Sequence, residues 1–383
     1  MNIEFSERLN SLPPYLFAEI DKARRRAIEE GRDIIDLGVG DPDSPTPDFI
    51  VEAMKKAIVD GVNHHYALDL GMPRMRQAIA GWYERRFRVK LDPDKEVLPL
   101  IGSKEGIAHL PLALINPKDK VLVPEPCYPP YRSGVIFAGG KVETVPLLAK
   151  NRFLPDLSKL KEGRLIFVNY PNNPTAAVAD ANFYKSLVDL SNEKGMMIAS
   201  DLAYSEIYFD DQKPSSLLEV EHSRDAAIEF HSLSKTFNMT GWRIGWACGN
   251  SQIIGALSKL KTNIDSGIFQ AVQVAGITAL EADDSHPEEM RRLYQERRDY
   301  LINGLRSIGW KIDAPTASFY VWAKLPKGYD SSLGLAKLFL EKADIIVTPG
   351  IGFGKSGEGY VRFALTVSRD RINEAVDRLK KIL

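Results

Sequence analysis

Between residues 97 and 250 the sequence alternates short β-rich runs with helix-length segments, and this alternation limits the fold more than any other feature. The runs are VLPLI, KVLVP, KVETVPL, LIFVN, MMIAS, AAIEF and RIGWAC. Strands separated by helices indicate a mostly parallel sheet that helices cover on both faces. In such sheets ligands bind beyond the carboxyl ends of the strands. We therefore expect an α/β fold whose chemistry lies in the loops after these runs.

The chain has 383 residues, more than one simple core accommodates, so two interwoven domains are expected. Residues 46–285 would form the large domain, and residues 286–383 a smaller α+β domain. Residues 1–45 would form an N-terminal arm and part of the small domain. Thr46, followed by Pro47 and Asp48, is typical of a helix start, with a capping hydroxyl, then proline and an acid in the first turn.

Composition excludes several function classes. The formal net charge of −1 gives no general attraction to nucleic acid or to an anionic membrane. No stretch reaches the roughly 18 apolar residues that a membrane span needs, and the N-terminus has no signal-peptide core. Two cysteines, Cys127 and Cys248, supply neither a disulfide framework nor a metal cluster. A cytoplasmic enzyme without a metal is the expectation.

A lysine follows the run AAIEF, in Ser232-Leu233-Ser234-Lys235. A phosphate dianion needs hydroxyl donors and a positive charge in one place, and Ser232 with Arg243 offers both. A lysine that forms a Schiff base needs surroundings that keep its amine reactive, and neighbouring cations help. The alternative is an ordinary solvated lysine.

Two more segments follow predicted strands. Gly102-Ser103-Lys104 leads into a helix, whose free N–H groups could bind phosphate, although Ser103 could also be a simple N-cap. Asp201 ends the run MMIAS, where an acid in apolar surroundings needs a cationic partner. A protonated pyridine nitrogen would be such a partner. A helix N-cap is the alternative for Asp201.

Three further positions suit a flat, carboxylate-bearing ligand. Asn173 lies in the turn after LIFV, where an amide could bond a ring hydroxyl. Tyr128, fixed between prolines, could stack on a ring. Arg362 stands in an apolar strand and could grip a carboxylate through its guanidinium fork, or form a structural ion pair.

Two phosphate-loop patterns fail. Gly354-Lys355-Ser356 resembles the end of a Walker loop, but the first glycine would fall at Pro349. Gly38-Val39-Gly40 lacks the third glycine of a dinucleotide fingerprint, because residue 43 is Asp.

Taken in order, GSKEG, PCYPPY, NYPNNPT, SDLAYSE, SLSKTFNMTGWRIG and YVRFALT resemble the motifs of the class I/II aminotransferases. These are pyridoxal 5′-phosphate (PLP) enzymes of fold type I. The resemblance extends from DLGVGDPD to Arg362. It implies a large domain with a mostly parallel seven-stranded sheet, a smaller α+β domain, and ping-pong transfer between an amino acid and a 2-oxo acid.

The resemblance also implies residue roles. Lys235 would form the Schiff base and shuttle the proton, Asp201 would hold the pyridinium nitrogen, and Tyr204 with Asn173 would hold the ring hydroxyl. Tyr128 would stack on the ring. Gly40 N–H and Arg362 would grip the substrate carboxylate, with Tyr128 and Asn173 beside it. The residues implied to bind the phosphate are Ser103, Lys104, Ser232, Arg243 and Tyr66 of the partner subunit, and Ser234 is implied as a further contact of the cofactor. Sharing of Tyr66 implies an obligate homodimer.

Several details resemble one branch, the LL-diaminopimelate aminotransferases. These details are Tyr15 in the N-terminal arm, DLGVGDPD, PCYPPYRSG and TNIDSGIFQAVQ. They imply that Tyr15, Lys104 and Asn263 of the partner subunit read the distal group of the substrate, and that Asp69 is the nearest match for an acid near Tyr66. Aspartate enzymes of one branch carry an arginine where this chain has Ser258.

Alternatives remain open at this point. A broad aspartate, aromatic, alanine or branched-chain aminotransferase and a PLP β-lyase share these motifs, whereas a PLP-binding regulator would need a fused DNA-binding module. One departure from the family is Ala176, where glycine usually follows Asn-Pro-Thr. Alanine lacks glycine's ease at positive φ, so this loop is expected to differ slightly.

Overall fold

The seven β-rich runs all form strands of one sheet. The structure is a computed structural model that describes residues 3–13, 16–67 and 70–383. Tyr15 and Asp69, two of the residues named above, lie outside the described residues. The strands are β2 (Val97–Leu100), β3 (Lys120–Glu125), β4 (Lys141–Pro146), β5 (Leu165–Asn169), β6 (Met197–Asp201), β7 (Ala227–Ser232) and β8 (Gly245–Gly249).

Within the described residues this sheet has seven strands in the order β2-β8-β7-β6-β5-β3-β4. Strand β8 is antiparallel to both of its neighbours, β2 and β7, and the remaining pairs are parallel. The prediction of a mostly parallel sheet is confirmed. Six strands therefore end at the same edge, and β8 begins there.

Both faces of the sheet are buried, which explains why its strands are continuously apolar rather than alternating. In β5, Leu165 and Phe167 belong to one apolar cluster, and Ile166 and Val168 belong to another. The helices that cover the two faces of this sheet supply much of the rest of these two clusters. They are α3 (Asp48–Ile58), α4 (Pro73–Phe87), α5 (Ser103–Leu114), α6 (Pro130–Phe137), α7 (Ala181–Lys194), α8 (Leu233–Thr236), α9 (Ser251–Thr262) and α10 (Gln270–Glu281).

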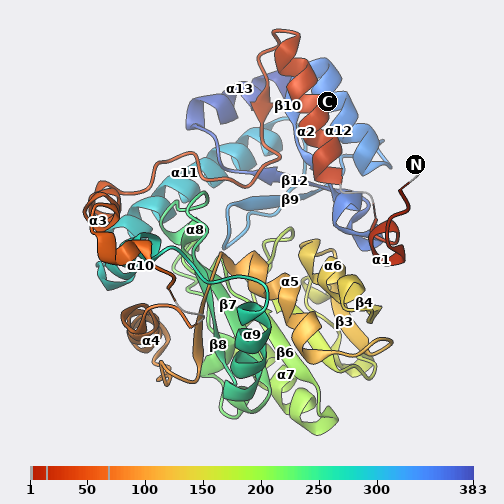
Figure 1. The fold of residues 1–383 in the computed structure, drawn as a ribbon. Helices are drawn as coiled ribbons and strands as arrows, with labels where there is room; N and C mark the ends of the chain where they lie inside the picture. The colour runs from red at the N-terminus through yellow and green to blue at the C-terminus, as the bar shows by residue number, and fades with distance from the viewer. Residues whose placement is uncertain (1–2, 14–15, 68–69) are drawn as a thin grey trace.

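A third apolar cluster lies above the carboxyl edge of the sheet, in the part of the molecule drawn in blue in Figure 1. Its three-stranded sheet has the order β11-β12-β9, and β1 pairs with β10. The strands are β1 (Ile35–Asp36), β9 (Tyr320–Lys324), β10 (Ile345–Ile346), β11 (Thr348–Pro349) and β12 (Tyr360–Ala364), and the helices are α11 (Ser285–Ser307), α12 (Ser332–Ala343) and α13 (Arg369–Leu379). Helix α2 (Leu16–Glu29) precedes β1 in the chain, and α1 (Glu7–Asn10) contacts α6 (Figure 1).

The predicted helix start at Thr46 is wrong in one detail. Pro47, not Thr46, occupies the N-cap of α3, and no side chain caps this helix. The Thr46 hydroxyl instead donates a 2.9 Å hydrogen bond to the Asn238 carbonyl. The hydroxyl that the local pattern predicts as a helix cap therefore bonds a carbonyl 192 residues further along the chain.

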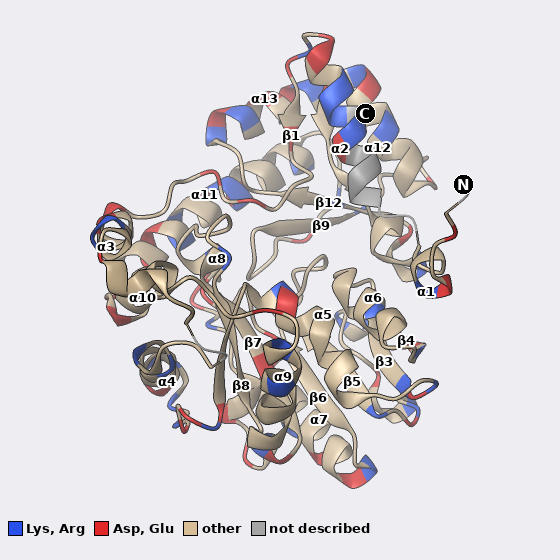
Figure 2. Cartoon of the chain, in the orientation of Figure 1, with Lys and Arg blue, Asp and Glu red and all other residues tan. Residues whose placement is uncertain are grey.

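Charged residues of both signs lie mainly on the helices and loops, and few lie on the strands of the large sheet (Figure 2). Among the described helices, none is both long and apolar enough to cross a membrane.

Candidate active site

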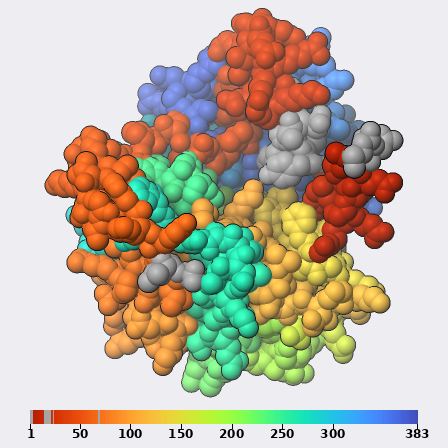
Figure 3. Space-filling model, viewed as in Figure 1, coloured from red at the N-terminus to blue at the C-terminus, as the bar shows by residue number. Residues whose placement is uncertain are grey.

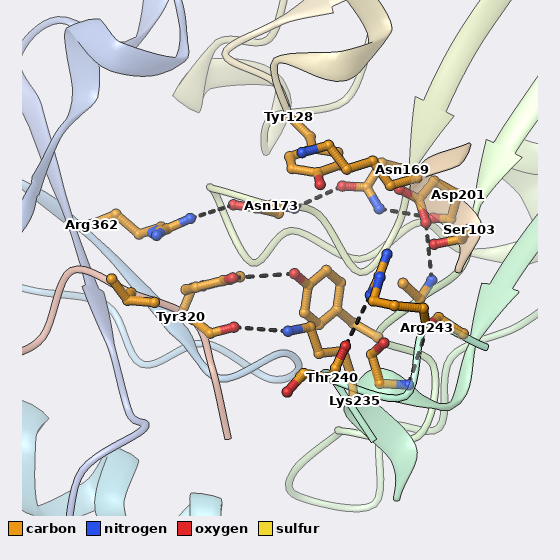
Figure 4. Close-up of a pocket in the computed structure, with 17 residues that line it drawn as sticks. Ser103, Tyr128, Asn169, Asn173, Asp201, Lys235, Thr240, Arg243, Tyr320 and Arg362 are labelled. Atoms are coloured by element: carbon orange, nitrogen blue, oxygen red, sulfur yellow. Dashed lines mark hydrogen bonds between the residues drawn. The ribbon is translucent and has the colours of Figure 1, made fainter. Parts of the chain in front are cut away.

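A cavity of about 500 Å³ opens at the carboxyl edge of the large sheet, below strands β9 and β12. Most of the residues singled out in the sequence meet there (Figure 4). Its lining consists of Val39, Gly40, Ser103, Lys104, Tyr128, Asn169, Asn173, Asp201, Ala203, Tyr204, Ser232, Ser234, Lys235, Thr240, Arg243, Tyr320 and Arg362. Loops after β2, β3, β5, β6 and β7 all contribute, as expected for strands that end at one edge.

Lys235 projects into this cavity from the short helix α8, which Ser232 caps by accepting a 3.1 Å hydrogen bond from Ser234 N–H. The Lys235 amine donates a 2.8 Å hydrogen bond to the Gly40 carbonyl. Burial lowers the pKa of Lys235 to about 8; Arg362 and Arg243 push in the same direction, and Asp41 opposes them. About a tenth of the amine is therefore an uncharged nucleophile at pH 7, far more than for a lysine with an unperturbed pKa.

Asp201 ends β6 and is buried on the floor of the cavity. Its carboxylate accepts a 2.7 Å hydrogen bond from the Tyr131 hydroxyl and a 3.2 Å bond from Ala203 N–H. Burial raises the pKa of Asp201 to about 6, although both hydrogen bonds oppose this rise. A cationic ligand atom beside this carboxylate would be strongly stabilised.

Tyr131 was missed by the sequence reasoning. Its ring stacks on Phe167 at 5.1 Å, which fixes the hydroxyl toward Asp201. The only available signal was a second aromatic residue in PCYPPY, and nothing local showed that it would face β6 rather than the core.

One corner of the cavity is rich in donors and positive charge. Ser103 is the first residue of α5 rather than its N-cap, since Gly102 occupies that position with φ +74°. A side chain at Gly102 would overlap the Arg243 guanidinium, so glycine lets this cation approach the helix N-terminus. Partial burial, together with Arg243, lowers the pKa of Lys104. A dianion such as phosphate would find N–H donors, hydroxyls and two cations here.

Arg362 forms the opposite wall of the cavity and is buried. Its guanidinium donates to Asn173 Oδ1 at 2.7 Å and to the Gly38 carbonyl at 2.6 Å. The same guanidinium lies over the Tyr320 ring at 4.1 Å. This arrangement fixes the plane of the guanidinium, as recognition of a carboxylate by both arms of the fork requires.

Tyr320 is a second residue that the sequence reasoning missed. Its hydroxyl lies 3.1 Å from that of Tyr204, and a side chain at Gly40 would overlap its phenol. No motif surrounds Tyr320 in the sequence, so only its position in the fold reveals it. Tyr128 also lines the cavity, with its ring edge-to-face on that of Tyr131 at 5.8 Å.

Two residues that the family resemblance named lie outside the cavity of a single chain. Tyr66 is 81% exposed, and Asn263 at the end of α9 is also exposed. Gln270 joins their neighbourhoods by donating to the carbonyls of His65 and Tyr66 at 3.1 and 3.4 Å. These bonds place residues 65 and 66 beside the first residue of α10, which follows α9 in the chain.

Comparison with known proteins decides the family. The family model for aminotransferase class I and II matches residues 32–379. The chain belongs to this family. The LL-diaminopimelate aminotransferase of Aquifex aeolicus is 53% identical over 384 residues, which cover 99% of each chain.

Solved structures agree with the fold. The substrate-bound BacF structure from Bacillus subtilis superposes with a TM-score of 0.95 at 38% identity, over 100% of this chain and 98% of that one. The aspartate aminotransferase of Thermotoga maritima gives 0.91 at 29% identity, over 98% and 99% of the two chains. The predicted α/β fold and the predicted family are confirmed, and the chain is a transaminase.

Class I and II aminotransferases work with PLP, which is therefore the cofactor of this chain. The cavity suits that group. PLP carries a pyridine nitrogen at one side of its ring and a phosphate at another. The nitrogen becomes cationic when it is protonated. The buried Asp201 carboxylate matches the first, and the corner around Ser103, Lys104 and Arg243 matches the second.

Proposed function

We propose that this aminotransferase moves an amino group from LL-2,6-diaminopimelate to 2-oxoglutarate, in the cytoplasm. The observation that carries the substrate assignment is similarity along the whole chain to enzymes of that name, at 53% identity in Aquifex aeolicus and 52% in Halothermothrix orenii. Identity at this level leaves little room for insertions that would rebuild a substrate pocket, because 99% of this chain aligns with each of the two.

The residues of the cavity take the following roles in this proposal. Asp201 holds the ring nitrogen, Asn173 and Tyr204 hold the ring hydroxyl, and Tyr128 covers one ring face. The phosphate is held by Ser103, Lys104, Ser232, Arg243 and Tyr66 of the partner subunit, and Ser234 also contacts the cofactor. When bound, PLP withdraws electrons from the α-carbon of an amino acid, which makes the proton on that carbon acidic.

Lys235 supplies both the attachment point and the base. Its amine is held by the Gly40 carbonyl, and burial lowers its pKa to about 8, so it can take up and release a proton at the substrate α-carbon near neutral pH. Arg362 and Gly40 N–H bind the α-carboxylate, which keeps the Cα–H bond in front of the amine. The distal end of the substrate is bound by Tyr15 and Lys104, together with Asn263 of the partner subunit.

An exposed apolar surface supports the proposal of a homodimer with shared sites. Helix α3 and residues 61–64, in the orange part of Figure 3, contact α10, which directly follows residues 263–269 in the chain. The exposed large apolar side chains of this surface are Phe49, Ile58, Val59, Val62, Tyr66, Leu70, Ile264 and Phe269. Soluble monomers rarely expose so many apolar groups on adjoining segments, and a second copy would cover them. Sedimentation at assay concentration tests this, and an active monomer would contradict it.

The deciding experiment is a half-reaction titration of the PLP-loaded enzyme, which follows loss of the visible cofactor absorbance. LL-diaminopimelate and glutamate are expected to convert the cofactor, while aspartate, alanine and phenylalanine react weakly. Conversion chiefly by aspartate or phenylalanine would favour the second candidate, a broad aminotransferase. That candidate is supported by the Thermotoga maritima enzyme and by an aromatic aminotransferase from Pyrococcus horikoshii, which is 30% identical. Release of ammonia without a 2-oxo acid would indicate a β-lyase.

A further inference from the structure

Tyr320 contacts three of the residues proposed to bind the cofactor and the substrate, although no sequence motif includes it. It opens strand β9 of the small domain and is only 3% exposed. Its hydroxyl reaches the Tyr204 hydroxyl at 3.1 Å, as the dashed line in Figure 4 shows, and the Arg362 guanidinium covers its ring at 4.1 Å. Glycine at position 40 leaves the space that the phenol occupies.

The direction of the hydrogen bond between the two phenols follows from counting hydrogens. Each hydroxyl has one hydrogen to donate and can accept from others. In the proposed function, Tyr204 donates its hydrogen to the ring oxygen of the cofactor. Tyr204 can then only accept from Tyr320, so the order of donation is Tyr320 to Tyr204 to the ring oxygen.

Such a chain strengthens the second bond. A hydroxyl that accepts a hydrogen bond becomes a better donor, because the two bonds polarise each other in a medium of low dielectric constant. Both phenols are buried, at 3% and 7% exposure, so water competes little for them. The positive charge of Arg362 over the Tyr320 ring adds to the effect, since it draws electron density away from the hydroxyl.

We propose that Tyr320 is a positioning residue, whose hydroxyl orients the Tyr204 phenol as a donor to the cofactor's ring oxygen and thereby lowers the pH at which the visible absorbance of the bound cofactor titrates. This inference rests on the proposed function, because it needs PLP in the cavity with its ring oxygen at Tyr204. A residue of strand β9 would then tune the cofactor, although the loops of the seven-stranded sheet bind most of it.

The test is an absorbance titration of the PLP-loaded dimer between pH 5 and pH 10. Tyr320→Phe keeps the ring under Arg362 and removes only the hydroxyl. A weakened donor stabilises the deprotonated ring oxygen less, so the titration midpoint should rise by about 0.5 to 1 pH unit. An unchanged or lowered midpoint would overturn the inference.

Tyr294→Phe is the matched control. Tyr294 packs its ring on Phe319, the neighbour of Tyr320, at 5.3 Å, and it is fully buried. Among the described residues its hydroxyl has no hydrogen-bond partner. Loss of this hydroxyl should leave the midpoint within about 0.2 unit, well under the shift for one hydrogen bond. An equal shift in both variants would mean that the spectrum responds to packing alone.

A double-mutant cycle tests whether Tyr320 acts through Tyr204. Tyr204→Phe should raise the midpoint more than Tyr320→Phe does, and Tyr320→Phe should add nothing once Tyr204 is Phe. Additive shifts would contradict the relay. Failure of the proposed function gives a different result: a wild-type chain that binds no PLP, or whose bound PLP shows no titration, refutes the proposed site and not the relay within it.

Discussion

The Tyr131 hydroxyl donates a 2.7 Å hydrogen bond to Oδ2 of Asp201, and this bond joins the first turn of α6 to the end of β6 beneath the cavity. A buried carboxylate is normally paired with a cation. Within the described residues its hydrogen bonds come from neutral donors, the Tyr131 phenol and Ala203 N–H. Burial therefore dominates and keeps the pKa of Asp201 raised to about 6. Without its cofactor the chain holds a carboxylate prepared for a cationic partner.

Asp201→Asn should stabilise the cofactor-free chain at pH 7 while abolishing transfer. The carboxyl titrates near 3.8 when unfolded and near 6 when folded, so the folded state binds more protons between these values. Stability therefore falls as the pH rises from about 4 to 6 and then stays low, by about 3 kcal/mol in all. Asparagine removes this fall. Urea unfolding of the wild-type chain and of Asp201→Asn at pH 4.5 and 7 measures this difference in stability. Equal pH dependence in the two proteins would contradict the raised pKa of Asp201.

The Lys235 amine should become reactive at a lower pH than other lysines. Burial, with Arg362 and Arg243 nearby, lowers its pKa to about 8, so the neutral amine forms as the pH rises through 8. Acylation of the cofactor-free chain, with Lys235→Ala as the blank, should give a midpoint near that value. Asp41 raises this pKa, so Asp41→Asn should move the midpoint lower still. A midpoint above 10 would show an ordinary, solvated lysine.

Ala176→Gly should stabilise the fold by about 0.5–1 kcal/mol. Ala176 keeps the left-handed conformation, with φ +58°, in which its N–H donates to the Asn172 carbonyl at 2.8 Å. Alanine is strained there and glycine is not. Ala177→Gly is the control, since Ala177 is not among the positive-φ residues and its replacement should destabilise by a similar amount. Urea midpoints of the two variants should move in opposite directions; movement in the same direction would contradict the strain.

Lys261→Met should destabilise the fold by about 3 kcal/mol. Lys261 is 1% exposed, and its amine bonds Asp265 at 2.6 Å and both carboxylate oxygens of Glu105 at 3.2 and 3.3 Å. Removal of the ammonium leaves Glu105 and Asp265 without their shared cation, close to the proposed phosphate site. Lys259→Met, on the exposed side of the same helix, should stay within about 0.5 kcal/mol. Comparable losses in the two variants would rule out the buried network as the cause.

Much of the site follows from the sequence because it depends on local pattern and strand direction. Apolar runs of strand length identified all seven strands of the large sheet. Parallel strands end at one edge, so Ser103, Tyr128, Asn173, Asp201 and Lys235 had to converge once those strands paired. Local chemistry also singled out Arg243 and Arg362, and the resemblance in motifs added Gly40 and Tyr204; all four line the same cavity.

The remainder depended on contacts between distant segments. Thr46 donates to Asn238 rather than capping its helix, Tyr131 faces Asp201, and Tyr320 reaches Tyr204 from 116 residues further along the chain. Tyr66 and Asn263 lie on the surface, so their proposed roles require a second copy. Sequence alone determined which chemistry the chain carries, because backbone periodicity and the residues that follow each strand are local properties. The tertiary structure decided which side chains orient that chemistry, because such contacts depend on how whole elements pack.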